Sequence, residues 1–168
     1  MNDTTAPTAT TANFQVQDAY FDDFIRRLGF GVKVEKDKED IEPTHAYTVG
    51  LVLSHGVELV AAVNRKTSHI HAVMTETVNR MRAGEPWKEG FTSEHYKVRL
   101  GEGEPQPARI GVRKITFDSF NDFVGIYYKR AEFFPLYQLI LPDDNNVLPG
   151  EPGYASIALK QKLYPTLN

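Results

Sequence analysis

Two pairs of ionisable side chains have the types and spacing that acid–base or metal chemistry requires. His55 and Glu58 lie three residues apart in one short segment, and Asp143 and Asp144 directly follow an apolar run and a proline. An imidazole suits proton transfer or metal binding, and a carboxylate can orient it or bind a divalent cation. These residues therefore allow a small hydrolase-like site in which His55 is the general base, Glu58 orients it or binds a metal, and Asp143 completes the site. Asp is also a frequent turn residue, so the Asp143–Asp144 pair can instead form the turn after the proline.

The segment around Glu58 also allows a non-enzymatic binding site. If residues 45–53 and 57–63 form a β-hairpin through Ser54-His55-Gly56, Thr48, Gly50 and Glu58 share one face with other small side chains. A glycine inside a strand often marks the close approach of a ligand or another backbone, whereas a plain antiparallel strand would leave Glu58 facing solvent. Trp87, in a loop after a helix, could anchor a partner or cover the core. The predicted ligand-binding residues are Thr48, Gly50, Glu58 and Trp87.

No motif in the sequence completes a catalytic or metal site. Gly-x-Ser-x-Gly, Ser-x-x-Lys and His-Glu-x-x-His are absent, and the lack of cysteine excludes a thiol nucleophile and Cys-bound zinc. His69 and His71 fall in a helical pattern, about 200° apart around the axis, which makes it difficult for them to bind one ion together. We therefore favour a binding or interaction protein over an enzyme and assign neither a metal site nor a cofactor.

Length and composition restrict the class of protein. The 168 residues, 41% hydrophobic and 24% charged, fit one globular domain. The net charge of −3 argues against generic nucleic-acid binding. No apolar run reaches the roughly 18 residues of a membrane span, and the first residues lack the features of a signal peptide. We expect a soluble cytoplasmic protein with an unknown protein or small-molecule partner, either as a monomer or as a homo-oligomer.

Hydrophobic periodicity predicts an α+β fold. The mainly antiparallel sheet is expected to carry two or three amphipathic helices on one face. We expect a mobile tail over residues 1–13, a single domain over 14–149 and a loosely attached C-terminal extension over 150–168. The predicted helices cover residues 14–29 and 67–84, a third begins at Asp118, and a short one covers 154–163; the predicted strands cover 30–35, 45–53, 57–63, 96–100, 109–116 and 136–141.

Two phrases of the sequence resemble a bacterial family known as domain of unknown function 4262. The first is Tyr47-Thr48-Val49-Gly50-Leu51 followed by His55 and Glu58-Leu59, and the second is the apolar strand that ends in Pro142-Asp143. Members typically carry Y-T-V-G-L, then G-H-P-E-L, and often a Trp before the closing proline. This chain departs from that pattern with one more residue between His55 and Glu58, and with Leu141 in place of the Trp. The resemblance spans roughly residues 28–149 and supports the domain boundaries, while the family name assigns no biochemistry.

Overall fold

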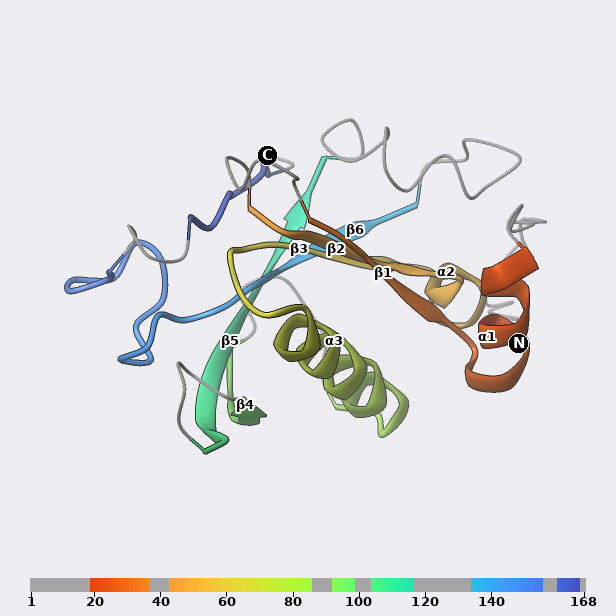
Figure 1. Ribbon diagram of the computed structural model, residues 1–168, viewed down its shortest axis with the longest axis horizontal. Coiled ribbons are helices and arrows are strands. Elements are labelled where there is room, and N and C mark those ends of the chain that lie inside the picture. Colours follow the sequence, from red (N-terminus) through yellow and green to blue (C-terminus); the bar gives the residue numbers. More distant parts are fainter. Residues whose placement is uncertain are drawn as a thin grey trace, which may run out of the picture.

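A curled six-stranded sheet forms the centre of the protein, as Figure 1 shows for the computed structural model. The structure describes residues 19–36, 43–85, 92–98, 104–116, 134–155 and 160–166. Trp87 and the helix expected from Asp118 therefore lie outside the described residues. The described elements are α1 (Ala19–Leu28), β1 (Gly31–Glu35), β2 (His45–Val49), α2 (Leu51–His55), β3 (Glu58–Ala62), α3 (Thr67–Arg82), β4 (Thr92–Val98), β5 (Gln106–Ile115) and β6 (Leu136–Ile140).

The strand order is β1-β2-β3-β6-β5-β4. The α+β class is confirmed, but the sheet is mixed rather than mainly antiparallel, because β3 and β6 run parallel and the other neighbouring strands run antiparallel. Parallel neighbours need a long crossover, and here the chain passes through α3, β4 and β5 before β6 returns beside β3. The periodicity of residues 136–141 predicted a strand, but it held no information about which strand would be its neighbour.

Both faces of the sheet are covered. On one face, Ile70, Val73, Met74 and Val78 of α3 pack against a cluster that includes Leu59 of β3. On the other face, a second cluster joins strand residues to Phe21 of α1, Val52 of α2 and Tyr164; its strand members include Tyr47, Val49, Val60 and Leu136. The expectation that the helices pack on a single face is therefore wrong, because α1 and α2 contribute to the cluster opposite α3.

The predicted hairpin between residues 45–53 and 57–63 is also wrong in its turn and register. β2 ends at Val49, and Leu51–His55 form the short helix α2. Gly50 and Gly56, with φ of 93° and 68°, bracket this helix in the left-handed conformation that glycine adopts without strain. The observed pairing sets Tyr47 opposite Val60, whereas the hairpin would have set Gly50 there. A short apolar run such as Leu51-Val52-Leu53 fits a strand or a helix equally well.

The C-terminal segment 160–166 is attached to the sheet rather than loosely tethered. The buried amide of Gln138 donates to the carbonyl of Lys162 and accepts from the backbone N–H of Tyr164 at 3.0 Å. Lys162 N–H donates to the carbonyl of Ala62 at 2.9 Å. None of the described residues between 154 and 163 is helical, so the short helix expected there is not formed in the described part.

Candidate functional site

Glu58 lies at the centre of a buried hydrogen-bond network. It is fully buried, and its Oε1 accepts the N–H groups of Gly50 at 2.9 Å and Val52 at 3.1 Å. Its Oε2 accepts the hydroxyl of Thr48, whose oxygen in turn accepts the Leu59 N–H at 2.8 Å. The first N–H groups of a helix have no partner within the helix, and Glu58 satisfies two of them at the start of α2. The carboxyl group therefore joins β2, α2 and β3.

Among the described residues, the space beside Gly50 is filled rather than open. A Cβ placed on this glycine would lie 2.5 Å from Cγ1 and 2.6 Å from Cδ1 of Ile25, so the side chain of α1 fills the space. Thr48, Gly50 and Glu58 thus lie together as expected from the sequence, but they are all buried within the protein. The solvent-facing alternative for Glu58 is wrong as well, since strand β3 is buried along its whole length.

His55 is the last residue of α2 and is half-buried. Its Nδ1 lies 2.8 Å from the Ser54 hydroxyl. Burial, and secondly the positive charge of Arg82, lower the pKa of His55 below its ordinary value, so a neutral ring is favoured at neutral pH. A neutral imidazole can accept a proton, although the three donors to Glu58 described above all come from residues 48–52 rather than from this ring.

Asp143 organises a loop at the other end of the sheet. Its Oδ1 accepts the N–H groups of Asn145 at 2.9 Å and Val147 at 3.0 Å, and its Oδ2 accepts the Ala155 N–H at 2.8 Å. Burial alone would raise the pKa of Asp143, but these three bonds and the charge of Arg65 outweigh it and leave the pKa lowered. The turn interpretation of Asp143 matches this geometry. Asp144 is exposed and pairs with Arg65 at 2.6 Å.

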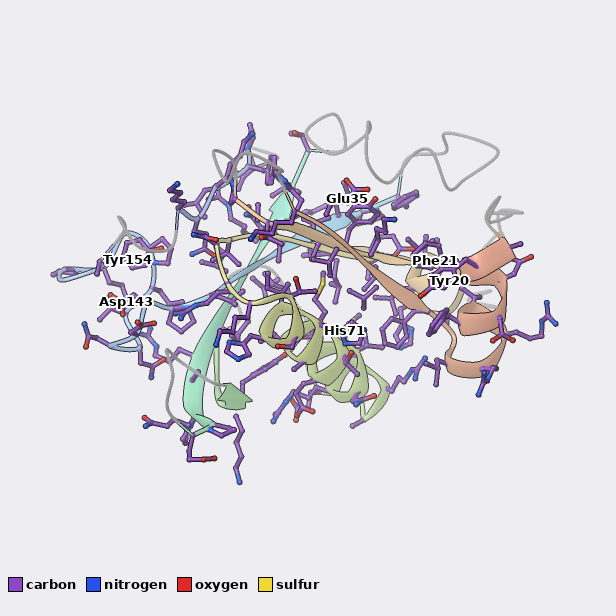
Figure 2. All side chains as sticks on the ribbon, viewed as in Figure 1. Tyr20, Phe21, Glu35, His71, Asp143 and Tyr154 are labelled. Carbon is purple, nitrogen blue, oxygen red and sulfur yellow. The ribbon has the colours of Figure 1, made fainter. Side chains whose placement is uncertain are left out.

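The structure does not bring Asp143 together with Glu58. Glu58 lies beside Leu136 at the start of β6, and the four steps from there to Ile140 span about 13 Å. Asp143 lies three residues beyond the end of that strand. In Figure 2 Asp143 is at the end of the molecule opposite Tyr20 and Phe21. A cleft shared by His55, Glu58 and Asp143 is therefore not formed.

A groove of about 560 Å³ runs between α1, β1 and α3. Figure 2 shows Tyr20 and Phe21 on one side and His71 of α3 on the other. The α1 wall is aromatic and aliphatic, the α3 wall is polar, and the floor is apolar except for Lys33. Tyr20, Phe21, Phe24 and Leu28 form the first wall, Thr67, His71, Thr75, Asn79 and Arg82 form the second, and Phe30, Val32, Lys33 and Val34 form the floor.

The α1 wall exposes three large apolar side chains. Tyr20 is 67% exposed, Leu28 54% and Phe24 36%, and these three residues recur every four positions on one side of the helix. In the sequence, Phe21, Phe24, Ile25 and Leu28 recur at helical spacing, and this spacing predicts a single apolar stripe along the helix. The structure divides it, because Phe21 and Ile25 pack into the second core cluster, with Phe21 also reaching the groove, while the exposed Phe24 and Leu28 face the groove with Tyr20.

The charged groups of the groove are cationic. Lys33 and Arg82 line it, and the described lining residues include no carboxylate. Arg82 is held in place because it donates to the Leu28 carbonyl and its guanidinium lies 5.3 Å from the centre of the Phe30 ring. Sequence reasoning missed this site, although the four-residue spacing of Thr67, His71, Thr75 and Asn79 gave a polar line on α3 that core packing does not require.

A comparison with known families assigns the chain. The profile described as Domain of unknown function (DUF4262) matches residues 25–155, most of the sequence. The chain belongs to the DUF4262 family. The comparisons of this chain with curated proteins and with solved structures found no match.

In this DUF4262 chain, the two phrases that carry the resemblance have structural roles. Thr48 and Gly50 bind Glu58, and Asp143 holds the loop after β6. Among the described residues, no three His, Asp or Glu side chains are grouped to hold a metal ion. No helix of the described part is long and apolar enough to cross a membrane.

Proposed function

We propose that this DUF4262 chain is a non-enzymatic binding module whose ligand occupies the groove between α1, β1 and α3. The exposed apolar wall of α1 carries the proposal. Large apolar side chains that gather on a surface and are rimmed by polar residues are typical of interaction sites, and ligand pockets commonly measure about 300–1,000 Å³. The ligand is expected to combine an apolar surface with an anionic group, because the described lining has an apolar wall and its charged side chains, Lys33 and Arg82, are cationic.

The hydrolase-like alternative has less support from the same geometry. This alternative pairs a histidine base with a carboxylate that orients it, and the described lining of the groove contains His71 without a carboxylate. The carboxyl groups of Glu58 and Asp143 are each occupied by backbone N–H groups from their own surroundings. A binding function therefore needs only the residues that line the groove, whereas catalysis would also need a carboxylate beside the histidine.

Titration with 8-anilinonaphthalene-1-sulfonate, an apolar aromatic anion, tests the proposal. We expect saturable fluorescence enhancement with the wild type and at least a tenfold loss of affinity in the double variant Tyr20→Ser/Leu28→Ser, since removing two apolar contacts costs about 1.4 kcal/mol or more. The matched control is Leu53→Ser/Leu163→Ser, which removes side chains that are 43% and 42% exposed outside the groove. Equal affinity in the two double variants would contradict the proposal.

A further inference from the structure

We propose that the groove binds an extended acidic peptide segment, which adds a strand to the edge of β1 that no described strand pairs with. This inference rests on the proposed function and names the class of partner. β1 is at the end of the strand order and pairs only with β2 among the described strands. An edge strand presents unpaired N–H and C=O groups that can pair with another chain, and peptides are often recognised in this way.

The floor of the groove follows this edge. Val32, Lys33 and Val34 are consecutive residues of β1, and all three line the groove. Successive side chains of a strand point to opposite faces of the sheet, so a groove that meets all three runs along the edge rather than over one face. Phe21, from the cluster opposite α3, also lines it. A bound segment would therefore lie within reach of the β1 main chain.

The two walls match the dimensions of an extended chain. Side chains on the same side of a strand recur roughly every 6.6–6.8 Å. This spacing is close to the rise of about 6 Å along the axis of a helix over four residues. One side of a bound strand would meet Thr67, His71 and Thr75, while the other would meet the α1 wall. From Thr67 to Arg82 the α3 wall is about 22 Å long, which accommodates an extended segment of six or seven residues.

The charge of the groove indicates which polar side chains the partner carries. The chain as a whole carries a net charge of −3, yet Lys33 and Arg82 are in the groove and its described lining has no carboxylate. The alternate polar side chains of the partner are therefore expected to be acidic, and the others apolar to match Tyr20, Phe24 and Leu28. A second copy pairing through its own β1 is disfavoured, because it would bring its flanking α1 and α3 against those of the first copy.

A synthetic peptide tests the inference directly. The probe is fluorescein-labelled Val-Glu-Val-Glu-Val-Glu-Val with blocked ends, measured by fluorescence anisotropy against the full chain. We expect saturable binding that displaces the anilinonaphthalene dye, with at least a tenfold loss for the Val-Lys analogue. Two N-methylated isomers, modified at the Val or at the Glu positions, each remove the donors of one strand edge. At least one isomer should bind tenfold more weakly than the parent, although both keep every side chain.

The protein variants give a matched pair. Lys33→Gln should weaken binding of the acidic peptide about threefold or more, whereas Lys97→Gln, an exposed lysine on β4 at the other edge of the sheet, should leave it unchanged. Dye binding without peptide binding, or indifference to both N-methyl patterns, would overturn the peptide inference and leave the proposed function standing. Absence of both would overturn both. A dimer that Tyr20→Ser/Leu28→Ser dissociates would overturn it in favour of a second copy.

Discussion

Glu58 illustrates how a buried carboxyl group can hold a fold together. The residue before a helix often carries a side chain that accepts one of the first N–H groups of the helix, but the residue before α2 is Gly50, which has no side chain. Glu58, on β3, accepts the N–H groups of Gly50 and Val52, and the Thr48 hydroxyl donates to Glu58 while its oxygen accepts the Leu59 N–H. Three segments thus depend on one side chain that has no exposed surface.

We expect Glu58→Gln to lower the free energy of unfolding by about 1–3 kcal/mol. The amide nitrogen of the glutamine would face the Thr48 hydroxyl, which donates to the carboxylate in the wild type and would lose its acceptor. Urea unfolding monitored by circular dichroism measures the loss, with exposed Glu104→Gln as the control. The structural role would be contradicted if Glu58→Gln kept wild-type stability but abolished binding of the anilinonaphthalene dye in the groove.

The sequence correctly predicted that Thr48, Gly50 and Glu58 are neighbours, but for the wrong reason. The prediction used the register of a hairpin, whereas these residues meet because the helix α2 connects Gly50 to the strand that carries Glu58. The residue types alone could not distinguish a pocket from a filled space, because the side chain that fills it, Ile25, comes from α1. Contacts between distant segments decide whether a glycine gap is open.

At the scale of elements, two carboxylates organise the loop after β6. Asp143 accepts three backbone N–H groups, and Glu151 forms a two-point pair with Arg109 at 2.7 and 2.8 Å. The pKa of Glu151 is lowered, chiefly by its hydrogen bonds from Arg109 and Leu148. Such bonds lower a carboxyl pKa because they stabilise the charged form. The loop is therefore expected to respond to acid.

A lowered pKa in the folded state fixes the sign of that response. The ionised Asp143 stabilises the fold above the unfolded pKa, near 3.8, and this contribution is lost as the pH falls through the lower folded pKa. In the Glu151→Gln background, which removes the second carboxyl group, stability should fall from pH 5 to pH 3, and Asp143→Asn should flatten that slope. We also expect Asp143→Asn to cost about 2 kcal/mol at pH 7. Urea unfolding at several pH values measures both; a slope that Asp143→Asn leaves unchanged would contradict the assignment.

Element positions were largely predictable, and their partners were not. Strands β1, β3 and β6 and helix α3 follow their apolar periods closely, since each period reports on that segment alone. The apolar side of α1 was predicted as one stripe, but the period cannot say that part of it packs into the core and part lines a groove. The groove needs α1, β1 and α3 together, so no single segment signalled it.

At the scale of the whole molecule, segment 160–166 is attached to the sheet by hydrogen bonds to residues far away in the sequence. The sequence from Pro149 onward is rich in proline and glycine and lies beyond the family resemblance, which is why this end of the chain was expected to be loosely attached. Its order comes from distant groups: Gln138 and Leu141 of the β6 region bind Lys162, Tyr164 and the Gln161 side chain. Tyr164 is buried in the second core cluster, so the C-terminal segment is part of the core on that face.

Deletion of residues 160–168 should therefore destabilise the whole domain by about 3 kcal/mol or more, because it removes a buried aromatic ring and leaves the Gln138 amide without its partners. Tyr164→Ala should reproduce much of this loss, whereas Leu163→Ala, at an exposed neighbouring position, should cost little.

A double-mutant cycle tests the role of the Gln138 amide separately. Gln138→Leu should destabilise the full chain by about 1–3 kcal/mol but have little or no cost in the deletion variant, where the buried amide has already lost its hydrogen bonds. Equal costs of Gln138→Leu in both backgrounds would show that the segment and Gln138 act independently. That result would contradict the proposal that the Gln138 amide attaches segment 160–166 to the sheet.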